Sequence, residues 1–333
     1  MTPKPNFFIL GAPKCGTTSM AAWLGRHPAI YMPDKKEPNF FNTDINEPPI
    51  YGVGTLCDHE ALFAAATAAQ HVIGEASVFY LSSTVAVANI LHYQPDARFI
   101  VMLRNPVEMA PALHAEMLIH GLENIGDFRT AWDLQYVRRY GRHVPALSHS
   151  WRRQFLFAEV CALGTQLERL FAAVPRGRVL IILLEDIVAD PRREYLRALH
   201  FLGVHDDLRH EFPVYNSARA TRSPRLTRAL FLATNIKDRF GIRLNMDLYR
   251  RVFDYNVVTT PRKPPSRTVT DMLRCHFANE VTLLAHLLER NLEHWLAPPV
   301  PCAGADLEST VRQDLSAGPS RAAATRVTSL VRH

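Results

Sequence analysis

The sequence predicts an α/β fold in which a parallel sheet, flanked by helices, contains a phosphate-binding loop of the P-loop type. Four short runs are apolar on consecutive positions, as expected of strands covered on both faces: 7–10, 71–73, 98–103 and 178–184. Segments with helical periodicity separate them: 17–26, 84–92, 107–120 and 157–174. This alternation of strands and helices is typical of a parallel sheet with right-handed crossovers.

The last regular element is a long helix. From Thr270 to Trp295 the apolar residues keep to one helix face for about seven turns, and Thr270 or Asp271 can cap its start. After Ala297 the composition changes to Pro, Ala, Ser, Thr and isolated charges without periodicity. We therefore expect one folded domain over residues 1–297 and a flexible tail over 298–333.

Composition excludes several classes of protein. The 333 residues are 47% hydrophobic, enough for a large core, but no apolar run has the length of a signal peptide or a membrane span. Five cysteines form no C-x-x-C pair and no metal-ligand spacing, and their odd number argues against a disulfide framework. These features predict a cytoplasmic protein without a transmembrane segment or a metal site.

The charge of the chain indicates an anionic ligand. The net charge is +6 and the isoelectric point is about 9.2, but the Lys and Arg residues are scattered and no basic run is interleaved with aromatic residues. We therefore expect no nucleic-acid partner. An anionic cofactor or substrate is sufficient to explain the positive charge.

The loop after the first strand is the clearest functional signal. It reads G-A-P-K-C-G-T-T-S over residues 11–19 and runs from an apolar strand into a helix. Unpaired backbone N–H groups at such a helix start, together with the helix dipole, attract an anion. The residues expected to hold a phosphate group are Lys14, Cys15, Gly16, Thr17, Thr18 and Ser19.

This loop differs from the Walker loop G-x-x-x-x-G-K-[ST]. Gly11 and Gly16 keep the Walker spacing, but Lys14 lies two positions before the second glycine instead of directly after it. The displaced lysine would approach a bound phosphate from the middle of the loop. An ordinary strand-turn-helix connection with a surface lysine remains the alternative.

Two other segments carry charged residues suited to the same ligand. Arg104 follows the buried strand 98–103, so it lies at the carboxyl edge of the sheet, where its planar guanidinium can donate two hydrogen bonds to a second phosphate. Glu37 lies in the segment K-K-E-P-N-F-F (residues 35–41) and could take a proton from an attacking hydroxyl. A structural salt bridge for Arg104 and a solvated loop position for Glu37 are the alternatives.

Together these segments resemble the sulfotransferases that use 3'-phosphoadenosine 5'-phosphosulfate (PAPS), particularly the heparan sulfate sulfotransferases and their bacterial relatives. The resemblance rests on G-A-P-K-C-G-T-T-S, K-E-P-N-F-F and R-F-I-V-M-L-R-N-P-V-E, in this order. It continues through G-E-A-S (74–77), L-E-D-I-V-A-D-P (184–191), F-L-G-V (201–204) and R-N-L-E-H-W (290–295), and so covers residues 6 to about 297.

The resemblance implies that residues 1–297 form a sulfotransferase domain that binds PAPS as cofactor and moves its sulfuryl group in line to a hydroxyl or an amine. The loop that corresponds to Lys14–Ser19 holds the 5'-phosphosulfate, and Lys14 stabilises the leaving phosphate. The residue that corresponds to Arg104 holds the 3'-phosphate, and Glu37 is the general base. No metal is required for this transfer.

The sequence departs from the family pattern at two places. Relatives often carry a serine that binds the 3'-phosphate where this chain has Ala112, after Pro111 in the same predicted helix. His114 could compensate for the missing hydroxyl. Glycosaminoglycan enzymes also have a C-terminal K-G-R loop that this chain lacks, and Arg262 with Lys263, or Arg222 with Arg225, could supply its charge.

Two other functions remain open from the sequence. A P-loop kinase or nucleotide hydrolase is disfavoured by the displaced lysine, and a non-catalytic PAPS-binding relative is disfavoured because Lys14, Glu37 and Arg104 occur together. The acceptor is expected to be a glycan, a lipid or a small metabolite. The loops at about 42–70, 120–150 and 215–265 would select it.

Overall fold

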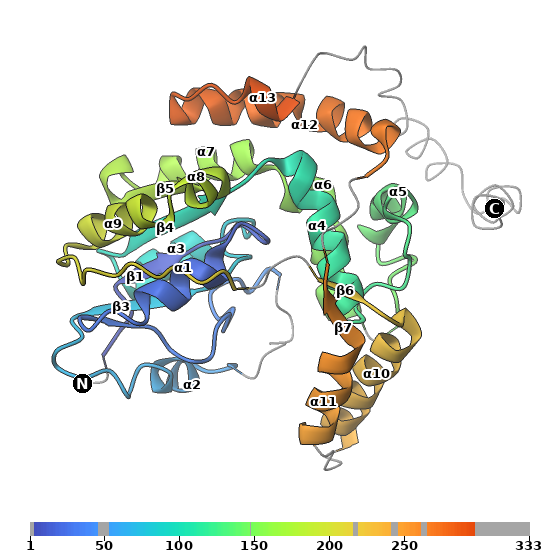
Figure 1. Ribbon diagram of the computed structural model, residues 1–333, viewed down its shortest axis with the longest axis horizontal. Helices are drawn as coiled ribbons and strands as arrows, with labels where there is room; N and C mark the ends of the chain where they lie inside the picture. Colours follow the sequence, from blue (N-terminus) through green and yellow to red (C-terminus); the bar gives the residue numbers. More distant parts are fainter. Residues whose placement is uncertain are drawn as a thin grey trace, which may run out of the picture. The chain divides into compact units, whose positions relative to one another are not determined.

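The computed structural model describes residues 3–45, 53–146, 148–215, 219–240, 246–260 and 265–296 (Figure 1). The chain divides into the compact unit Met1–Ala297 and the segment Pro298–His333. The expected tail therefore lies outside the described residues, as do Arg262 and Lys263. All the other candidate site residues lie in the described part of the first unit.

The core of this unit is a five-stranded sheet with the order β2-β3-β1-β4-β5. The strands are β1 (Phe7–Ile9), β2 (Ile30–Tyr31), β3 (Val72–Ala76), β4 (Arg98–Leu103) and β5 (Val179–Leu183). All four pairings are parallel; β1, for example, aligns Phe8 with Glu75 of β3 and with Phe99 of β4. The strands β1 and β3 are buried throughout, although β3 contains Gly74 and Glu75.

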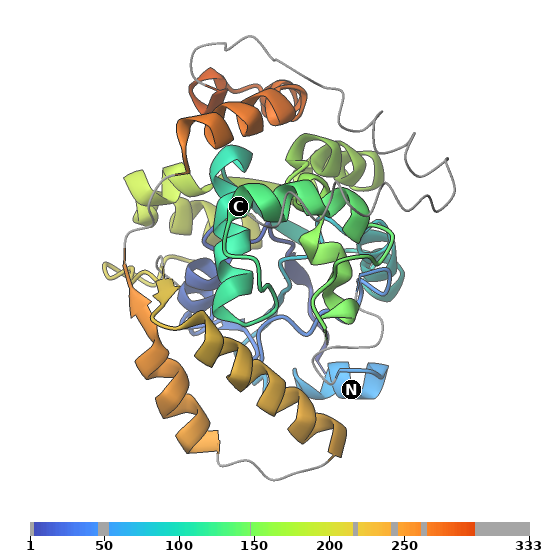
Figure 2. The same cartoon turned by 90° about the vertical axis from the view of Figure 1, so that its right-hand side faces the viewer.

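Helices flank this sheet and form most of the rest of the unit (Figures 1 and 2). They are α1 (Thr17–Leu24), α2 (Leu56–Ala61), α3 (Ala86–Tyr93), α4 (Pro106–Ile119), α5 (Phe128–Arg138), α6 (Phe157–Val160), α7 (Leu163–Ala173), α8 (Leu184–Ala189), α9 (Pro191–Leu202), α10 (Pro224–Phe240), α11 (Met246–Asn256), α12 (Arg267–Leu288) and α13 (Glu293–Leu296), with 3-10 turns at His149–Phe155 and Arg176–Arg178. Helix α1 packs against α9, whereas α3 and α12 pack against α7. The predicted α/β class with a parallel sheet flanked by helices is confirmed.

The predicted strands agree with the structure except at their ends. The strand at 98–103 has the predicted bounds, and the segments at 7–10 and 178–184 are each one residue shorter at one end or both. The segment predicted at 71–73 is longer in the structure, because β3 continues through Gly74 and Glu75 to Ala76. Gly and Glu are both rare in strands, so the sequence pattern did not predict that the strand continues through them.

The predicted helices at 17–26, 84–92 and 107–120 agree with α1, α3 and α4 to within two residues at each end, but two others differ more. The pattern at 157–174 forms α6 and α7, because the chain breaks at Cys161–Ala162 and the Gln166 amide donates to the carbonyls of Glu159 (2.7 Å) and Val160 (3.1 Å). The long terminal helix begins earlier than predicted, since Ser266 caps α12 by accepting the Val269 N–H. It also ends before Trp295, at Glu289, which has φ +53°.

A second, two-stranded sheet carries a helical pair that the sequence did not predict. Strands β6 (Arg219–Thr221) and β7 (Val257–Thr259) pair in antiparallel fashion, and α10 and α11 lie between them in the sequence. Figures 1 and 2 both show α10 and α11 side by side and extending away from the main sheet. Both β6 and α10 pack against α4, which connects this pair to the sheet.

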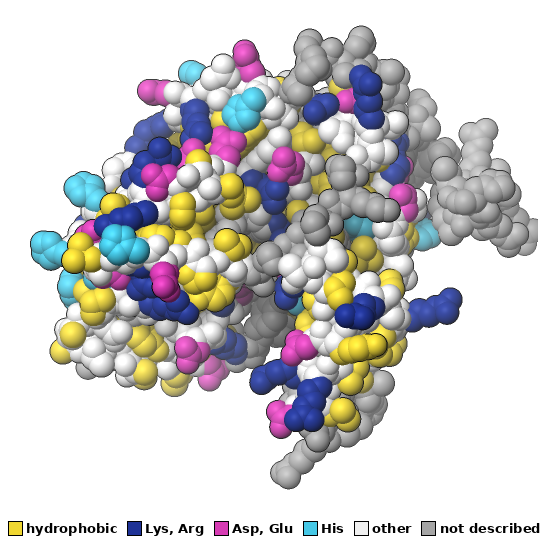
Figure 3. All heavy atoms as spheres, in the orientation of Figure 1, with side chains coloured by type: hydrophobic (Ala, Val, Ile, Leu, Met, Phe, Trp, Pro, Cys, Tyr) yellow, Lys and Arg dark blue, Asp and Glu magenta, His cyan; other side chains and the backbone are white. Residues whose placement is uncertain are grey.

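The remaining expectations concern charge, cysteines and membrane spans. On the face shown in Figure 3, Lys and Arg side chains are interspersed with Asp and Glu. Cys15, Cys57 and Cys161 are free, whereas Cys275 is disulfide-bonded. Among the described residues, no helix combines the length and hydropathy needed to cross a bilayer.

Candidate functional site

The loop between β1 and α1 has the backbone geometry of an anion cradle. Gly11 has φ +121°, and a Cβ atom there would lie 2.1 Å from the Val78 carbonyl oxygen, so only glycine fits. Gly16 has φ +85° and is the N-cap of α1, where no side chain caps the helix. The N–H groups at the start of α1 are therefore not satisfied by a side-chain cap, as the sequence predicted.

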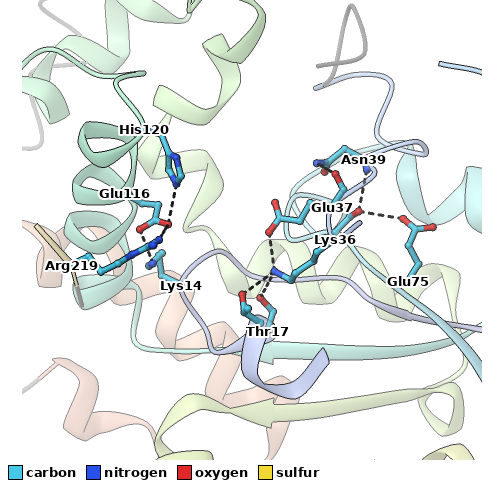
Figure 4. Close-up of polar contacts among 11 residues, drawn as sticks. Lys14, Thr17, Lys36, Glu37, Asn39, Glu75, Glu116, His120 and Arg219 are labelled. Atoms are coloured by element: carbon cyan, nitrogen blue, oxygen red, sulfur yellow. Dashed lines mark hydrogen bonds and ion pairs between the residues drawn. The ribbon is translucent and has the colours of Figure 1, made fainter. Parts of the chain in front are cut away.

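Lys14 forms an ion pair with a residue that no sequence motif marks. Its Nζ atom lies 2.9 Å from Oε2 of Glu116, which projects from α4 toward the loop (Figure 4). Arg219 of β6 contacts the other oxygen of Glu116 at 3.1 Å, and His120 lies 3.4 Å from the same oxygen. Three basic side chains thus surround one carboxylate beside the loop.

The environment keeps Glu116 charged. Burial by itself would raise the pKa of Glu116, but the hydrogen bond with His120 and the charge and hydrogen bond of Lys14 hold that pKa well below its ordinary value. Local sequence could not have identified Glu116, because it lies 102 residues from Lys14 and only the fold brings the two together.

Lys36 connects the phosphate loop to the segment that carries Glu37. Its Nζ atom donates to the hydroxyls of Thr18 (3.1 Å) and Thr17 (3.5 Å) and to Oε1 of Glu37 (2.9 Å). Figure 4 shows Lys36 between Thr17 and Glu37. The sequence predicted a carboxylate between two lysines, but it did not show that one of these lysines reaches the start of α1.

Arg104 lies beside the loop, at the carboxyl end of β4. Its Nη1 atom donates to the Lys14 carbonyl (3.2 Å), and Nη2 pairs with Glu108 one turn along α4 (2.5 Å). Its Nε atom is buried and has no hydrogen-bond partner among the described residues. The alternative of a helix salt bridge is therefore realised, although the guanidinium still has an unpaired donor.

Glu37 lies in a constrained turn next to the carboxyl end of β3. It has φ +61°, and its N–H donates to the Ala76 carbonyl at 2.9 Å. Asn39, at φ +50°, donates from its side-chain amide to the Glu37 carbonyl at 3.0 Å. Positive φ values are uncommon for residues other than glycine, so the contacts around this turn must hold it.

The other predicted ligand residues have different surroundings. The Cys15 thiol is buried, and burial raises its pKa to about 12, so only its backbone can face an anion. The Ser19 hydroxyl accepts the Tyr215 N–H at 3.0 Å. Ala112 is 2% exposed within α4, which runs without a break through Pro111.

The position of His114 argues against its expected role as a compensating phosphate ligand. The ring is 3% exposed, bonds the Ile125 carbonyl through Nε2 at 2.8 Å and packs against the rings of Phe128 and Phe157. Burial lowers its pKa. Arg222 lies over the Tyr255 ring, 5.0 Å from its centroid.

These residues fit a ligand with two anionic groups. Lys14, Lys36 and Arg104 place three positive charges around one loop at the start of α1, and the unpaired Arg104 Nε can donate to an oxyanion. In the sequence, Lys14 follows β1, Lys36 follows β2 and Arg104 follows β4. They converge at the carboxyl edge of the sheet around β1, where the strand order reverses and α/β sheets bind ligands.

Comparison with family models gives one match. Residues 55–207 match the model of the Sulfotransferase family. This segment includes β3, β4 and Arg104 but begins after Lys14 and Glu37. The placement of those two residues at the same sheet edge therefore comes from the structure.

Characterised relatives and a solved structure agree with this match. The membrane-associated sulfotransferase kil1 of Dictyostelium discoideum and human carbohydrate sulfotransferase 15 are each 32% identical over 31% of this chain. The chain spans only 21% and 26% of the length of these two relatives. The sulfotransferase of Alicyclobacillus acidocaldarius is 25% identical, with a TM-score of 0.64 over 88% of this chain and 99% of that one.

Proposed function

We propose that the chain is a sulfotransferase that transfers a sulfuryl group from PAPS to a hydroxyl or an amine of an acceptor, a proposal that the family match and the solved structure support. The observation that carries this proposal is the convergence of Lys14, Lys36, Arg104 and Glu37 at one sheet edge around a Gly-bounded loop. We propose a glycan, a lipid or a small metabolite as the acceptor.

The bound cofactor would supply a sulfuryl group whose bond to the 5'-phosphate oxygen breaks as a bond to the acceptor oxygen or nitrogen forms. Lys14 and Lys36, together with the N–H groups that begin α1, offset the charge that develops on the leaving phosphate. Glu37 takes the proton that the acceptor loses. Lys36, 2.9 Å from Oε1 of Glu37, keeps that carboxylate oriented toward the loop.

Arg104 would hold the 3'-phosphate without the serine that relatives place at position 112. Its Nε donor has no partner among the described residues, and its Nη2 partner Glu108 has a side chain that is 62% exposed. Because an exposed ion pair is weak, a phosphate can displace Glu108 and receive two donors of the guanidinium.

Calorimetry with the desulfated cofactor, 3'-phosphoadenosine 5'-phosphate (PAP), tests the cradle. A hydrogen bond to a charged group contributes about 1.5–3 kcal/mol, so Lys14→Ala and Arg104→Ala should each weaken PAP binding about tenfold to a hundredfold. Arg129→Ala, which removes an exposed ion pair on α5, is the control. Wild-type affinity in both cradle variants, or tighter binding of Mg-ATP than of PAP, would exclude the proposal.

Transfer of labelled sulfate from PAPS tests the chemical step. The acceptors are 4-nitrophenol, glucosamine, N-acetylglucosamine and a long-chain alcohol, which cover phenol, amine, sugar and lipid hydroxyls. Glu37→Gln should bind PAP normally and lose most of the turnover that the wild-type protein shows with the best of these. An unchanged rate would mean that another group is the base, and binding without transfer to any acceptor would indicate a non-catalytic relative.

A further inference from the structure

A buried polar cluster lies behind the turn that carries Glu37. It consists of His59, Glu75, Ser77 and Tyr80, each with 0% exposure. Glu75 is the fourth residue of β3, in the centre of an otherwise apolar core. A carboxylate in such a place is costly unless its oxygens are fully hydrogen-bonded, so its presence needs an explanation.

Three donors satisfy this carboxylate. Oε1 of Glu75 accepts from the Tyr80 hydroxyl at 2.5 Å and from the Ser77 hydroxyl at 3.2 Å, and Oε2 lies 2.7 Å from Nε2 of His59. Burial and the neighbouring charge of Glu75 raise the pKa of Tyr80 well above its ordinary value, so the phenol keeps the proton that it donates. Glu75 therefore fixes the direction in which both hydroxyl protons point.

With their protons directed at Glu75, the two hydroxyl oxygens accept hydrogen bonds from the turn. Tyr80 accepts the N–H groups of Phe40 (3.0 Å) and Phe41 (3.3 Å), and Ser77 accepts the N–H of Asn39 (3.2 Å). Three consecutive amides are thus bound by two hydroxyls that a single carboxylate orients. The His59 ring also stacks on the Phe40 ring, with centroids 4.7 Å apart and planes 18° from parallel.

This anchoring begins two residues after Glu37. Glu37 and Asn39 both have positive φ, a conformation that the surroundings must impose on them. The Asn39 side chain donates to the Glu37 carbonyl, so the anchored amides and the turn form one hydrogen-bonded unit (Figure 4). Without the two hydroxyl acceptors, three buried N–H groups would have to find water or another backbone conformation.

We propose that Glu75 is a positioning residue for catalysis, which acts through Ser77 and Tyr80 to hold Glu37 in the geometry that proton transfer requires. The proposal rests on the proposed function, because it takes Glu37 as the base. It assigns a purpose to a carboxylate, two hydroxyls and a histidine that are all buried behind the turn. A displacement of the base by about 1 Å can cost about a hundredfold in rate.

The test uses Tyr80→Phe and Ser77→Ala, each of which removes one hydroxyl from the core. Hydrogen exchange should rise about tenfold at Phe40 and Phe41 in Tyr80→Phe, and at Asn39 in Ser77→Ala. Turnover with the best of the four acceptors should fall about tenfold to a hundredfold in both variants. The dissociation constant for PAP should stay within about twofold of the wild-type value, because neither hydroxyl contacts the phosphate loop.

Tyr93→Phe is the matched control. Its hydroxyl also donates to a glutamate, Glu60 at 3.1 Å, and its ring lies 5.5 Å from that of Phe41, but it binds no amide of the turn. This variant should keep both the amide protection and the turnover of the wild-type protein. An equal loss in Tyr93→Phe would show that general core damage, and not the turn, lowers the rate.

Three further results would overturn the inference. They are unchanged exchange at Phe40 and Phe41 in Tyr80→Phe, increased exchange with unchanged turnover, and a loss of PAP affinity as large as the loss of turnover. Failure of the proposed function itself gives a different result, because the wild-type protein would then bind no PAP or transfer no sulfate.

Discussion

Glu116 shows at the scale of a single residue how the fold changes the meaning of a motif. The sequence motif alone suggests that Lys14 is available to bind a phosphate. In the structure, Glu116 lies 2.9 Å from Lys14 and offsets its charge. Arg219 and His120 contact the same carboxylate. The net charge beside the loop is therefore lower than the motif suggests, and an anionic cofactor must share Lys14 with Glu116 or displace it.

Replacing Glu116 should strengthen cofactor binding. Glu116→Gln removes a negative charge beside Lys14 and Arg219, so both side chains become available to a phosphate, and PAP affinity at low salt should rise about twofold to tenfold. Asp133→Asn, which removes one charge from an exposed pair on α5, is the control for net charge. Calorimetry that shows weaker binding in Glu116→Gln would mean that Glu116 holds Lys14 in its binding position.

Local sequence says least about the partners of single side chains. His114, Ser19 and Lys36 are all polar side chains close to recognised motifs. Only Lys36 contacts the phosphate loop from a neighbouring segment, whereas His114 bonds the Ile125 carbonyl and Ser19 bonds the Tyr215 backbone. Side-chain partners 11 to 196 residues away decide these roles, and local sequence does not encode them.

At the scale of elements, α4 is the helix that brings the site together. It begins beside Arg104 with Asn105 as N-cap and Pro106 at its first position, and it carries Glu116 one turn from its end. Pro111 lies inside it, where the ring removes one backbone hydrogen bond. A proline inside a helix usually disturbs it, but α4 is continuous, and it packs against α12 and β6.

Substitution of this proline should stabilise the protein. Pro111→Ala restores the N–H that can donate to the Val107 carbonyl, which stabilises the folded state. The substitution also raises the entropy of the unfolded chain, which opposes this gain. The free energy of unfolding should rise by about 1–2 kcal/mol as the net result. Urea unfolding measures this change. A decrease would show that the helix needs the local geometry of the proline to place Glu116.

Elements were predictable where local pattern and burial agree. The strand at 98–103 is apolar and buried from its second residue, and its bounds were predicted correctly. By contrast, β2 has only two residues and β3 contains Gly74 and Glu75, so pattern alone missed the first and shortened the second. Glu75 is stable in a strand only because Tyr80, Ser77 and His59 surround it.

At the scale of the whole unit, residues 290–295 pack at the end of the sheet where Arg104 lies. Glu185 of α8 contacts Arg290, His294 and Trp295, at 3.0, 2.9 and 3.0 Å. The Asn105 side chain donates to the Trp295 carbonyl at 3.1 Å. Segments about 110 and 190 residues apart in the chain are joined in this way.

Loss of this contact should destabilise the whole unit. Trp295 is 4% exposed, so Trp295→Ala creates a cavity and breaks the bond to Glu185, at a cost of about 3–5 kcal/mol in the free energy of unfolding. Tyr140→Ala removes an aromatic ring that is 61% exposed and should change the stability by less than about 0.5 kcal/mol. Denaturant unfolding in which the two variants behave alike would mean that α13 does not contribute to the cooperative core.

The sequence by itself determined the α/β class, the Gly-bounded loop after the first strand and the position of Arg104 beside that loop. It could do so because apolar runs mark buried strands, and the carboxyl ends of parallel strands share one edge. Only the tertiary structure decided the pairing of Lys14 with Glu116, the reach of Lys36 and the support of the Glu37 turn by Glu75. These contacts depend on how side chains that are distant in the sequence pack together, and such packing produces no periodic pattern in the sequence.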